Sequence, residues 1–478
     1  MDIIQWVDEN QKKFTDISDQ VWKFAELSHE EEKSAKLLAD TLESNGFRIQ
    51  KDIGDLPTAF IASYGEGKPV IAILGEYDAL PGLSQDKVPS KQPLEEGGNG
   101  HGCQHNLLGT GSLVGALAVK EYMEENNIKG TLRYYGCPAE ESGAGKTFMV
   151  KAGVFNDVDI ALCWHPSMLT GVWGMNVLAN FSILFRFHGR TAHAAADPYN
   201  GRSALDAVEL MNIGANYLRE HIISDARIHY VITNGGGQPN VVPAEAETWY
   251  YIRAPTIAQV KEIYERLCNV AKGAALMTDT ESEIIFLKGI SNLVLNKTIE
   301  EVIYEKIQEV GAPQFDEEEA KFAIDIKKNI PKANMGAFLP ILKQLDIPLE
   351  VIASFGERVF LDSVMPLLQK EVVLPGSTDV GDVSWVTPTA QFATTCQAIG
   401  TPGHSWQAVA QGGMSIGHKG MLTAGKIMAL TTIEFLQNEE LVIKAREEFE
   451  KKLREQPYVS PIPDGVKPRK SGYLAIDE

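Results

Sequence analysis

The chain has few cysteines and no long apolar segment. Five cysteines among 478 residues is an odd number at scattered positions, which argues against a disulfide framework and for reduced thiols. No uncharged apolar run reaches membrane-spanning length, and the first residues have neither the basic start nor the apolar core of a signal peptide. We therefore expect a cytoplasmic protein without a membrane partner.

Positive charge is also scarce. Lys and Arg total 44 against 64 Asp and Glu, which gives a formal net charge of -20. Most of the surface would repel a polyanion, so a nucleic-acid partner is disfavoured. A carboxylate on a small substrate would need local cations, and Arg202 and Arg253 are candidates because guanidinium binds carboxylate bidentately. A surface salt bridge is the commoner role for each.

The apolar pattern predicts an α/β fold. Residues 1–177 alternate short apolar runs with helical patterns, which is typical of a sheet with helices on both faces. The runs at 70–74, 131–136 and 159–164 are predicted buried strands. Between the first two, apolar residues at spacings of three to four predict one stripe of a helix that ends near Asn126.

A second pattern begins near residue 180. Strand and helix signals follow one another in the order βαββαβ, with Ser203 as the predicted cap of the first helix, and this order is typical of a ferredoxin-like unit. Residues 293–478 return to long helical patterns, including an amphipathic helix at 419–437. We expect a discontinuous α/β domain, 1–177 and 293–478, and an inserted α+β domain at 178–292.

Three short motifs carry residues that bind metals. Cys103 and His105 open the predicted helix, Glu140 and Glu141 follow one strand, and His165 ends the next. The carboxyl ends of strands in α/β sheets are where ligands gather, so we expect these side chains to meet. Alone, each motif is more often structural: a solvated acidic pair, a core histidine or a buried thiol. Together they favour a metal site.

The donor types limit the chemistry. Thiolate, imidazole and carboxylate suit zinc, although Mn or Co could take such a set, and ligands spread over several strand ends suit two ions. Adjacent glutamates can divide the work, because one can bind metal while its neighbour takes and returns a proton. The sequence therefore predicts a metal-dependent hydrolase.

These motifs resemble the M20 family of metallopeptidases and amidohydrolases, in its branch of N-acyl-amino-acid hydrolases. The resemblance covers nearly the whole chain. Its landmarks are GEYDALP at 75–81, the Cys-x-His motif, PAEE at 138–141, His165, GRTAHAA at 189–195, GGQPNVVP at 236–243 and GHSWQ at 403–407.

The resemblance implies roles for individual residues. It makes 1–177 and 293–478 the catalytic metal-binding domain and the insert a dimerisation or lid domain. It makes Glu140 the general base and acid and Asp78 a support of the site. It also places His193 of the insert in a partner's active site, where it steadies the oxyanion. Asn240 is implied in substrate contact. The implied ligands of two divalent ions, Zn²⁺ or Mn²⁺, are Cys103, His105, Glu141, His165 and His404, the last on resemblance alone.

The resemblance also implies the substrate and the assembly. The substrate would be a small N-acyl or N-aroyl amino acid, with p-aminobenzoyl-glutamate as the leading candidate. The assembly would be a homodimer, or a heteromer with a related subunit. Two positions depart from the family pattern: Asn106 stands where the branch usually has an aspartate, and Glu76 where other branches have a metal-binding histidine. Neither is expected to bind metal, which leaves the bridging group open.

Two other functions compete with this hypothesis. A thiol amidase could use Cys103 with His105, although two residues so close on one segment seldom reach nucleophile–base geometry. A non-catalytic subunit could keep the fold while another chain does the chemistry. Intact Glu140 and a full set of ligands argue against this second possibility.

Overall fold

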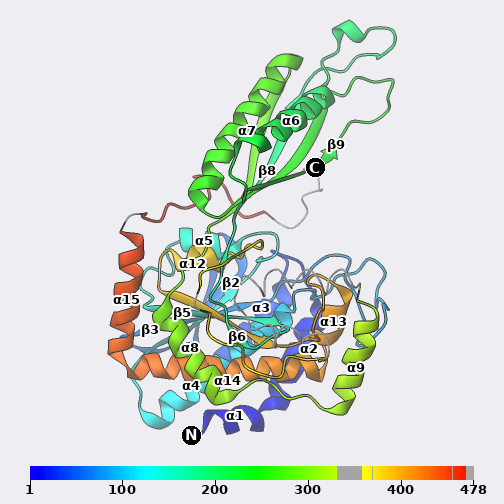
Figure 1. Cartoon of the computed structure of the whole chain (residues 1–478). Coiled ribbons are helices and arrows are strands. Elements are labelled where there is room, and N and C mark those ends of the chain that lie inside the picture. Colours follow the sequence, from blue (N-terminus) through cyan, green and yellow to red (C-terminus); the bar gives the residue numbers. More distant parts are fainter. Residues whose placement is uncertain (331–357, 369, 455, 470–478) are drawn as a thin grey trace. The chain divides into compact units, whose positions relative to one another are not determined.

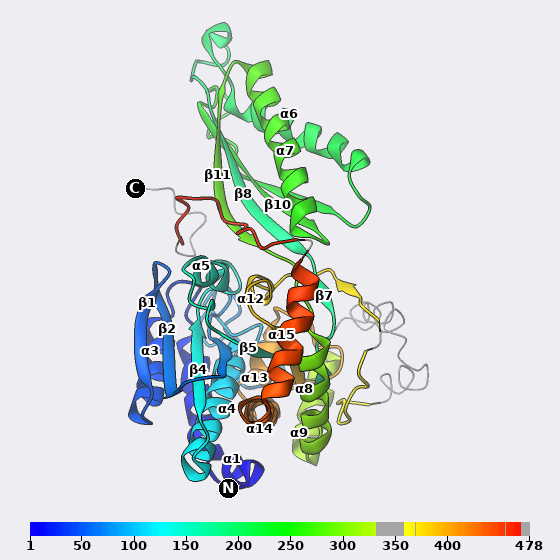
Figure 2. The same ribbon diagram turned by 90° about the vertical axis from the view of Figure 1, so that its left-hand side faces the viewer.

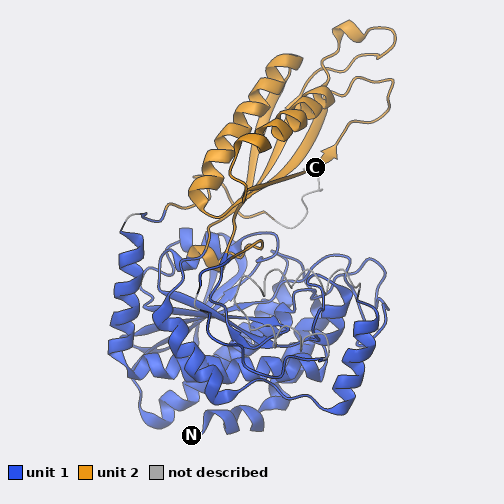
Figure 3. Cartoon of the chain, in the orientation of Figure 1, with its two compact units in different colours: residues 1–176, 293–372, 383–458 blue, residues 177–292, 373–382, 459–478 orange. Residues whose placement is uncertain are grey.

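The computed structural model describes residues 1–330, 358–368, 370–454 and 456–469 (Figure 1). The chain divides into two compact units (Figure 3). Unit 1 consists of 1–176, 293–372 and 383–458, and unit 2 of 177–292, 373–382 and the tail from 459. The predicted insert lies within unit 2, which also takes two later segments of the chain.

Unit 1 contains a mixed seven-stranded sheet. The three predicted buried strands are confirmed as β3, β4 and β5, which run parallel to one another, and β13 runs parallel to β5. β1, β2 and β6 pair antiparallel with their neighbours. In spatial order the strands are β1 (Arg48–Ile53), β2 (Leu56–Glu66), β4 (Gly130–Cys137), β3 (Val70–Glu76), β5 (Ile160–Ser167), β13 (Thr389–Thr395) and β6 (Gly171–Val172).

Two helices pack tightly on this sheet. α4 (His105–Asn126) ends where predicted, and it lies beside α14 (Ser415–Gln437) (Figures 1 and 2). α4 is more buried than a single apolar stripe predicts, because every residue from His105 to Val119 is buried. Glycines allow this close approach: a Cβ at Gly111 would lie 2.5 Å from the Trp164 ring, and one at Gly115 would lie 2.8 Å from Met428. All seven residues of β3 are buried, so both faces of the sheet are covered there.

The remaining elements of unit 1 are mostly helices. They are α1 (Ile3–Glu9), α2 (Gln11–Phe24), α3 (Glu32–Ser44), α5 (Gly145–Lys151), α8 (Lys297–Val310), α9 (Glu317–Lys328), α13 (Trp406–Gly412) and α15 (Glu439–Leu453). β7 (Asn176–Val177) and α12 (Val380–Ser384) lie where the chain passes from one unit to the other, and β12 (Val373–Leu374) belongs to unit 2. None of the helices in the described ranges has the length and apolar content needed to span a bilayer.

Unit 2 is the ferredoxin-like unit that the pattern predicts. Its antiparallel sheet has the order β11-β8-β10-β9, so the first and third strands are central. Ser203 caps α6 as predicted, because its side chain accepts a hydrogen bond from the amide of Asp206. The elements are β8 (Ala179–His188), α6 (Ala204–Leu218), β9 (Arg227–Asn234), β10 (Glu245–Ala254), α7 (Ile257–Thr278) and β11 (Glu281–Ile290), with 3₁₀ turns at Pro198–Asn200 and Arg219–His221.

Asp19 of α2 joins two distant parts of unit 1. Its Oδ1 lies 2.8 Å from Nζ of Lys87 and 3.2 Å from Nε2 of His418 in α14. Partial burial alone would raise the pKa of Asp19, but hydrogen bonds and charge from His418 and Lys87 lower it to about 2. The ion pairs therefore stabilise the fold while Asp19 is charged.

We predict that Asp19→Asn lowers the free energy of unfolding at pH 7 by about 1–2 kcal/mol, after allowance for solvent screening. Because the folded-state pKa is depressed, this contribution is present above the unfolded value of about 4 and is lost as the pH falls toward 2. Urea unfolding of both proteins at several pH values measures it. Asp16→Asn is the control, since Asp16 pairs with Lys12 at the exposed surface of the same helix and should change little. A difference that stays constant down to pH 3 would contradict the assignment.

Candidate metal centre

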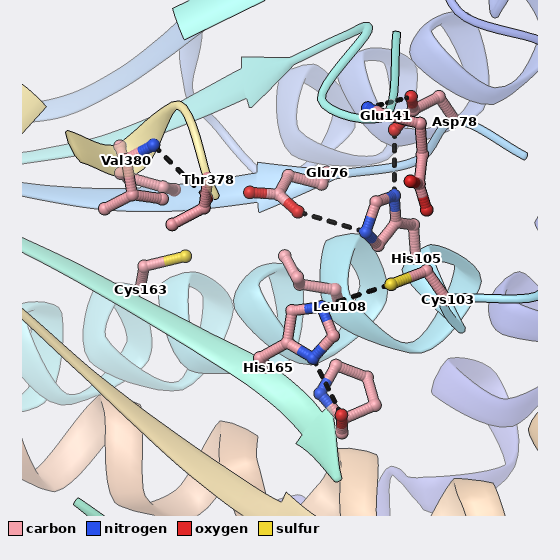
Figure 4. A network of polar contacts seen from close by, with 12 residues as sticks. Glu76, Asp78, Cys103, His105, Leu108, Glu141, Cys163, His165, Thr378 and Val380 are labelled. Atoms are coloured by element: carbon pink, nitrogen blue, oxygen red, sulfur yellow. Dashed lines mark hydrogen bonds and ion pairs between the residues drawn. The ribbon is translucent and has the colours of Figure 1, made fainter. Parts of the chain in front are cut away.

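The potential ligands meet at the carboxyl ends of the parallel strands (Figure 4). Among the residues that the structure describes, potential ligand atoms within 4.8 Å of one another form three groups, and the five predicted ligands all belong to the first two. The groups are Cys103 with His105 and His165, Cys103 with Glu141 and His404, and Glu76 with His105 and Glu140.

The loops that carry these side chains adopt strained backbone conformations. Gln104, Ala139, Ala144 and His404 all have positive φ, between 52° and 60°. Non-glycine residues rarely adopt this region, and such strain concentrates at functional sites. The amide of His404 donates to the carbonyl oxygen of Gly102 at 3.1 Å, so two segments far apart in sequence are fixed side by side.

Asp78 orients His105. Both side chains are fully buried, and Oδ1 of Asp78 lies 2.8 Å from Nδ1 of His105. The other carboxylate oxygen accepts hydrogen bonds from the Ser28 hydroxyl and from the amide of Glu141. Burial alone would raise the pKa of Asp78. The hydrogen bonds from His105 and these donors nevertheless hold it well below its usual value. Nδ1 of His105 is therefore used in the hydrogen bond to Asp78, and Nε2 remains as the nitrogen that can bind a metal.

His165 and Cys103 form the next part of the centre. Nδ1 of His165 lies 2.7 Å from the carbonyl oxygen of Pro166, which fixes Nδ1 as the protonated nitrogen and leaves Nε2 facing Sγ of Cys103 at 3.5 Å. Burial lowers the pKa of His165 to about 4, so its imidazole is neutral at physiological pH. Burial also raises the pKa of the Cys103 thiol. A neutral imidazole is the form that binds metal.

Glu141 and His404 complete the set. Oε2 of Glu141 lies 3.3 Å from Nε2 of His404, and the Glu141 side chain is 7% exposed while that of His404 is 56% exposed. Burial raises the pKa of Glu141 to about 8 despite the nearby His105. A buried carboxylate of this kind is stabilised by a cation, and the centre opens to solvent on the His404 side.

Sequence reasoning missed Lys146, and it noted its partner Glu76 only as a departure from the family pattern. Oε1 of Glu76 lies 2.6 Å from Nζ of the fully buried Lys146, and Oε2 lies 3.3 Å from Nε2 of His105. Lys146 lies in the first turn of α5, just after the Glu140–Glu141 pair. The signal in the sequence was a lysine in the first turn of a short helix that is otherwise uncharged there. Because lysines are rarely fully buried, the sequence does not predict that this lysine pairs with Glu76.

Asn106 has a structural role. Its side-chain amide donates to the Ser18 hydroxyl at 3.1 Å and to the carbonyl oxygen of Gly412 at 3.0 Å. Both hydrogens of the amide are used in these contacts. An aspartate at this position would lose both donors, so the departure from the family pattern fits the local packing.

The other predicted site residues lie in unit 2. His193 and Asn240 lie close together, because His193 bridges to Val241 and the carbonyl oxygen of Asn240 accepts from the amide of Ala194. Arg202 forms an ion pair with Asp279, the commoner role considered for it. Arg253, in β10, is half-buried and donates to the Ser377 hydroxyl at 3.0 Å.

The chain is similar to known proteins along part or nearly all of its length. The family model of the peptidase dimerisation domain matches residues 179–276, the core of unit 2. The chain is 47% identical over 467 residues to one of the subunits of p-aminobenzoyl-glutamate hydrolase from Escherichia coli (strain K12), covering 97% of each protein. It is 27% identical to the Xaa-Arg dipeptidase of Mus musculus, covering 94% of this chain and 92% of the relative.

A solved structure shares the fold. The dinuclear metal binding peptidase of the M20 family from Bacillus subtilis superposes with a TM-score of 0.56 at 18% identity, covering 90% of this chain and 99% of that one. The fold, the dimerisation domain and the identity to the hydrolase from Escherichia coli along nearly the full length agree with one another. The chain belongs to the M20 peptidase family.

Proposed function

We propose that this protein is a metal-dependent amide hydrolase that cleaves an N-acyl or N-aroyl amino acid. The observation that carries the proposal is the partly buried cluster in which Cys103 belongs to two groups of potential ligands and Glu140 lies beside them. The leading substrate is p-aminobenzoyl-glutamate, which is cleaved to p-aminobenzoate and glutamate. This choice is supported by the name of the relative that is 47% identical to the chain.

The donor set suits two divalent ions. Cys103, His105, Glu141, His165 and His404 would hold them, and Cys103 belongs to both groups that these five residues form. Thiolate and imidazole favour Zn²⁺, and Mn²⁺ is the alternative. When bound, such ions polarise the scissile carbonyl and acidify water.

Glu140 is proposed as the proton carrier. It lies in the turn after β4 beside the potential ligand Glu141, within reach of the same centre as His105. Its carboxylate takes a proton from the attacking water, whose oxygen forms a bond to the carbonyl carbon. When the C–N bond breaks, Glu140 returns that proton to the leaving nitrogen, so the products are a carboxylic acid and an amine.

Residues of unit 2 would recognise the rest of the substrate. His193 would stabilise the oxyanion from a neighbouring protomer, and Asn240 lies beside it on the same unit. Arg253 would bind the free carboxylate. Arg202 is a weaker candidate because Asp279 already pairs with it. The dimerisation-domain match supports a homodimer, and the naming of the relative as one subunit of its enzyme supports a heteromer as the alternative.

Two further observations bear on the proposal. All five cysteines are free, which supports a reducing compartment such as the cytoplasm. Burial raises the pKa of the Cys103 thiol. Because the thiolate is the nucleophilic form, this thiol is a poor nucleophile without metal, which argues against the thiol amidase.

Metal removal tests the proposed reaction. We expect thorough chelation to abolish cleavage of p-aminobenzoyl-glutamate and addition of Zn²⁺ or Mn²⁺ to restore it, because the ions supply the Lewis acid. A panel of N-acyl amino acids, followed by amine release, identifies the preferred acyl group. Full activity without metal would exclude the mechanism, and cleavage only after addition of a different protein chain would favour the non-catalytic role.

Glu140→Gln separates proton transfer from metal binding. The amide keeps the size of the side chain but cannot take a proton, so we expect kcat to fall by about 10²–10⁴-fold. Metal content should remain that of the parent. Glu141→Gln is the matched control one residue away, and it should lose metal as well as activity. Retention of kcat in Glu140→Gln would remove Glu140 from the reaction.

Substitution of Cys103 and of Asn106 tests the ligand assignment. Cys103→Ser should reduce the number of bound ions, measured by elemental analysis, because a neutral hydroxyl binds divalent ions more weakly than a thiolate. Asn106→Asp should instead destabilise the fold by about 2–4 kcal/mol, since it removes the hydrogen bond to the Gly412 carbonyl oxygen and places a carboxylate against it. If Asn106→Asp binds an additional ion without loss of stability, residue 106 can serve as a ligand.

A further inference from the structure

Lys146 is a fully buried lysine that the proposed reaction does not use. Its Nζ lies 2.6 Å from Oε1 of Glu76, whose side chain is 2% exposed. Buried ion pairs add little net stability compared with apolar side chains of the same size. Stability alone is therefore a weak reason for placing a lysine here.

The second oxygen of Glu76 faces the metal centre. Oε2 lies 3.3 Å from Nε2 of His105, the nitrogen that is left for a metal because Nδ1 is bonded to Asp78. A carboxylate oxygen of Glu140 also lies within 4.8 Å of these two side chains' ligand atoms. Figure 4 shows Glu76 directed toward His105. Glu76 is thus paired with the lysine and lies next to both a potential ligand and the proposed proton carrier.

The backbone that carries Lys146 is continuous with the Glu140–Glu141 turn. This turn is closed by a hydrogen bond from the amide of Gly143 to the carbonyl oxygen of Ala139 at 3.0 Å. Gly145 has no room for a side chain, because a Cβ would lie 2.0 Å from the carbonyl oxygen of Pro138. The Lys146–Glu76 pair therefore fastens this tight turn to the end of β3.

We propose that Lys146 is a positioning residue of the metal centre, which acts through Glu76 to fix His105 and Glu140 relative to one another. The inference rests on the proposed function, since it takes His105 as a ligand and Glu140 as the proton carrier. Lys146 itself touches neither substrate nor metal. Its contribution is the placement of groups that do.

Cobalt binding provides a test that does not depend on turnover. The double variant Glu76→Gln with Lys146→Met keeps the size of both side chains and leaves no unpaired buried charge, so it should fold with nearly the parent's melting temperature. We expect it to bind Co²⁺ about 10–100-fold more weakly than the parent, with altered visible absorption bands. In the cobalt-loaded enzyme kcat should fall by about 10–100-fold while KM changes much less.

Two further variants complete the experiment. Lys146→Arg keeps a cation beside Glu76 and should recover part of the cobalt affinity and of kcat. The matched control is Lys306→Met with Glu434→Gln, which removes an ion pair of 3.0 Å between α8 and α14 and should leave cobalt affinity, spectrum and kcat unchanged.

The outcomes separate this inference from the proposed function. Parent cobalt affinity, spectrum and kcat in a folded Glu76→Gln, Lys146→Met variant would overturn the positioning role and leave the proposed function intact. A loss of melting temperature alone, with unchanged cobalt binding and kcat, would overturn it too. If the parent binds no Co²⁺ and cleaves no N-acyl amino acid, the proposed function fails and the inference fails with it.

Discussion

The burial of several carboxylates around one imidazole is the constraint on which the centre of unit 1 depends. Each buried acid is held by donors from a different element. Asp78 binds His105, while Glu31, at the start of α3, accepts from the Thr58 hydroxyl and from the amide of Ala139. Burial and the nearby Asp78 raise the pKa of Glu31 to about 8. These acids fix the ends of β3 and β4 and the start of α3 in one arrangement, which is ready for cations.

The loops that carry this arrangement adopt unfavourable backbone conformations. Positive φ values at Ala139 and Ala144 bracket the Glu140–Glu141 pair, and His404 itself adopts a positive φ where it reaches the centre. α4, which begins at His105 of the site, packs closely against α14. A rigid scaffold with strain confined to the loops is the usual way to hold donors in a fixed geometry.

Local pattern was sufficient for much of the fold and for part of the site. Apolar runs predicted β3, β4 and β5, and the rule that ligands gather at strand ends predicted that Cys103, His105, Glu141 and His165 would meet. His404 needed the family resemblance, because it comes from a distant loop that only the folded chain brings to Gly102. Lys146 and Asn106 could not be interpreted from sequence. Their partners, such as Glu76 and Gly412, are defined by tertiary contacts between separate segments.

The composition of unit 2 has a consequence for how the chain is made. Its sheet comes from the middle of the sequence, yet Asp382 accepts hydrogen bonds from the amide and hydroxyl of Ser291. Pro461 packs so closely on Gly289 that a Cβ there would lie 2.9 Å from the proline side chain. A nascent chain leaving the ribosome therefore has the strands and helices of residues 179–290 before the two later segments that contact them. These contacts can be complete only after residue 461 has been synthesised, so unit 2 acquires them later than its own sheet.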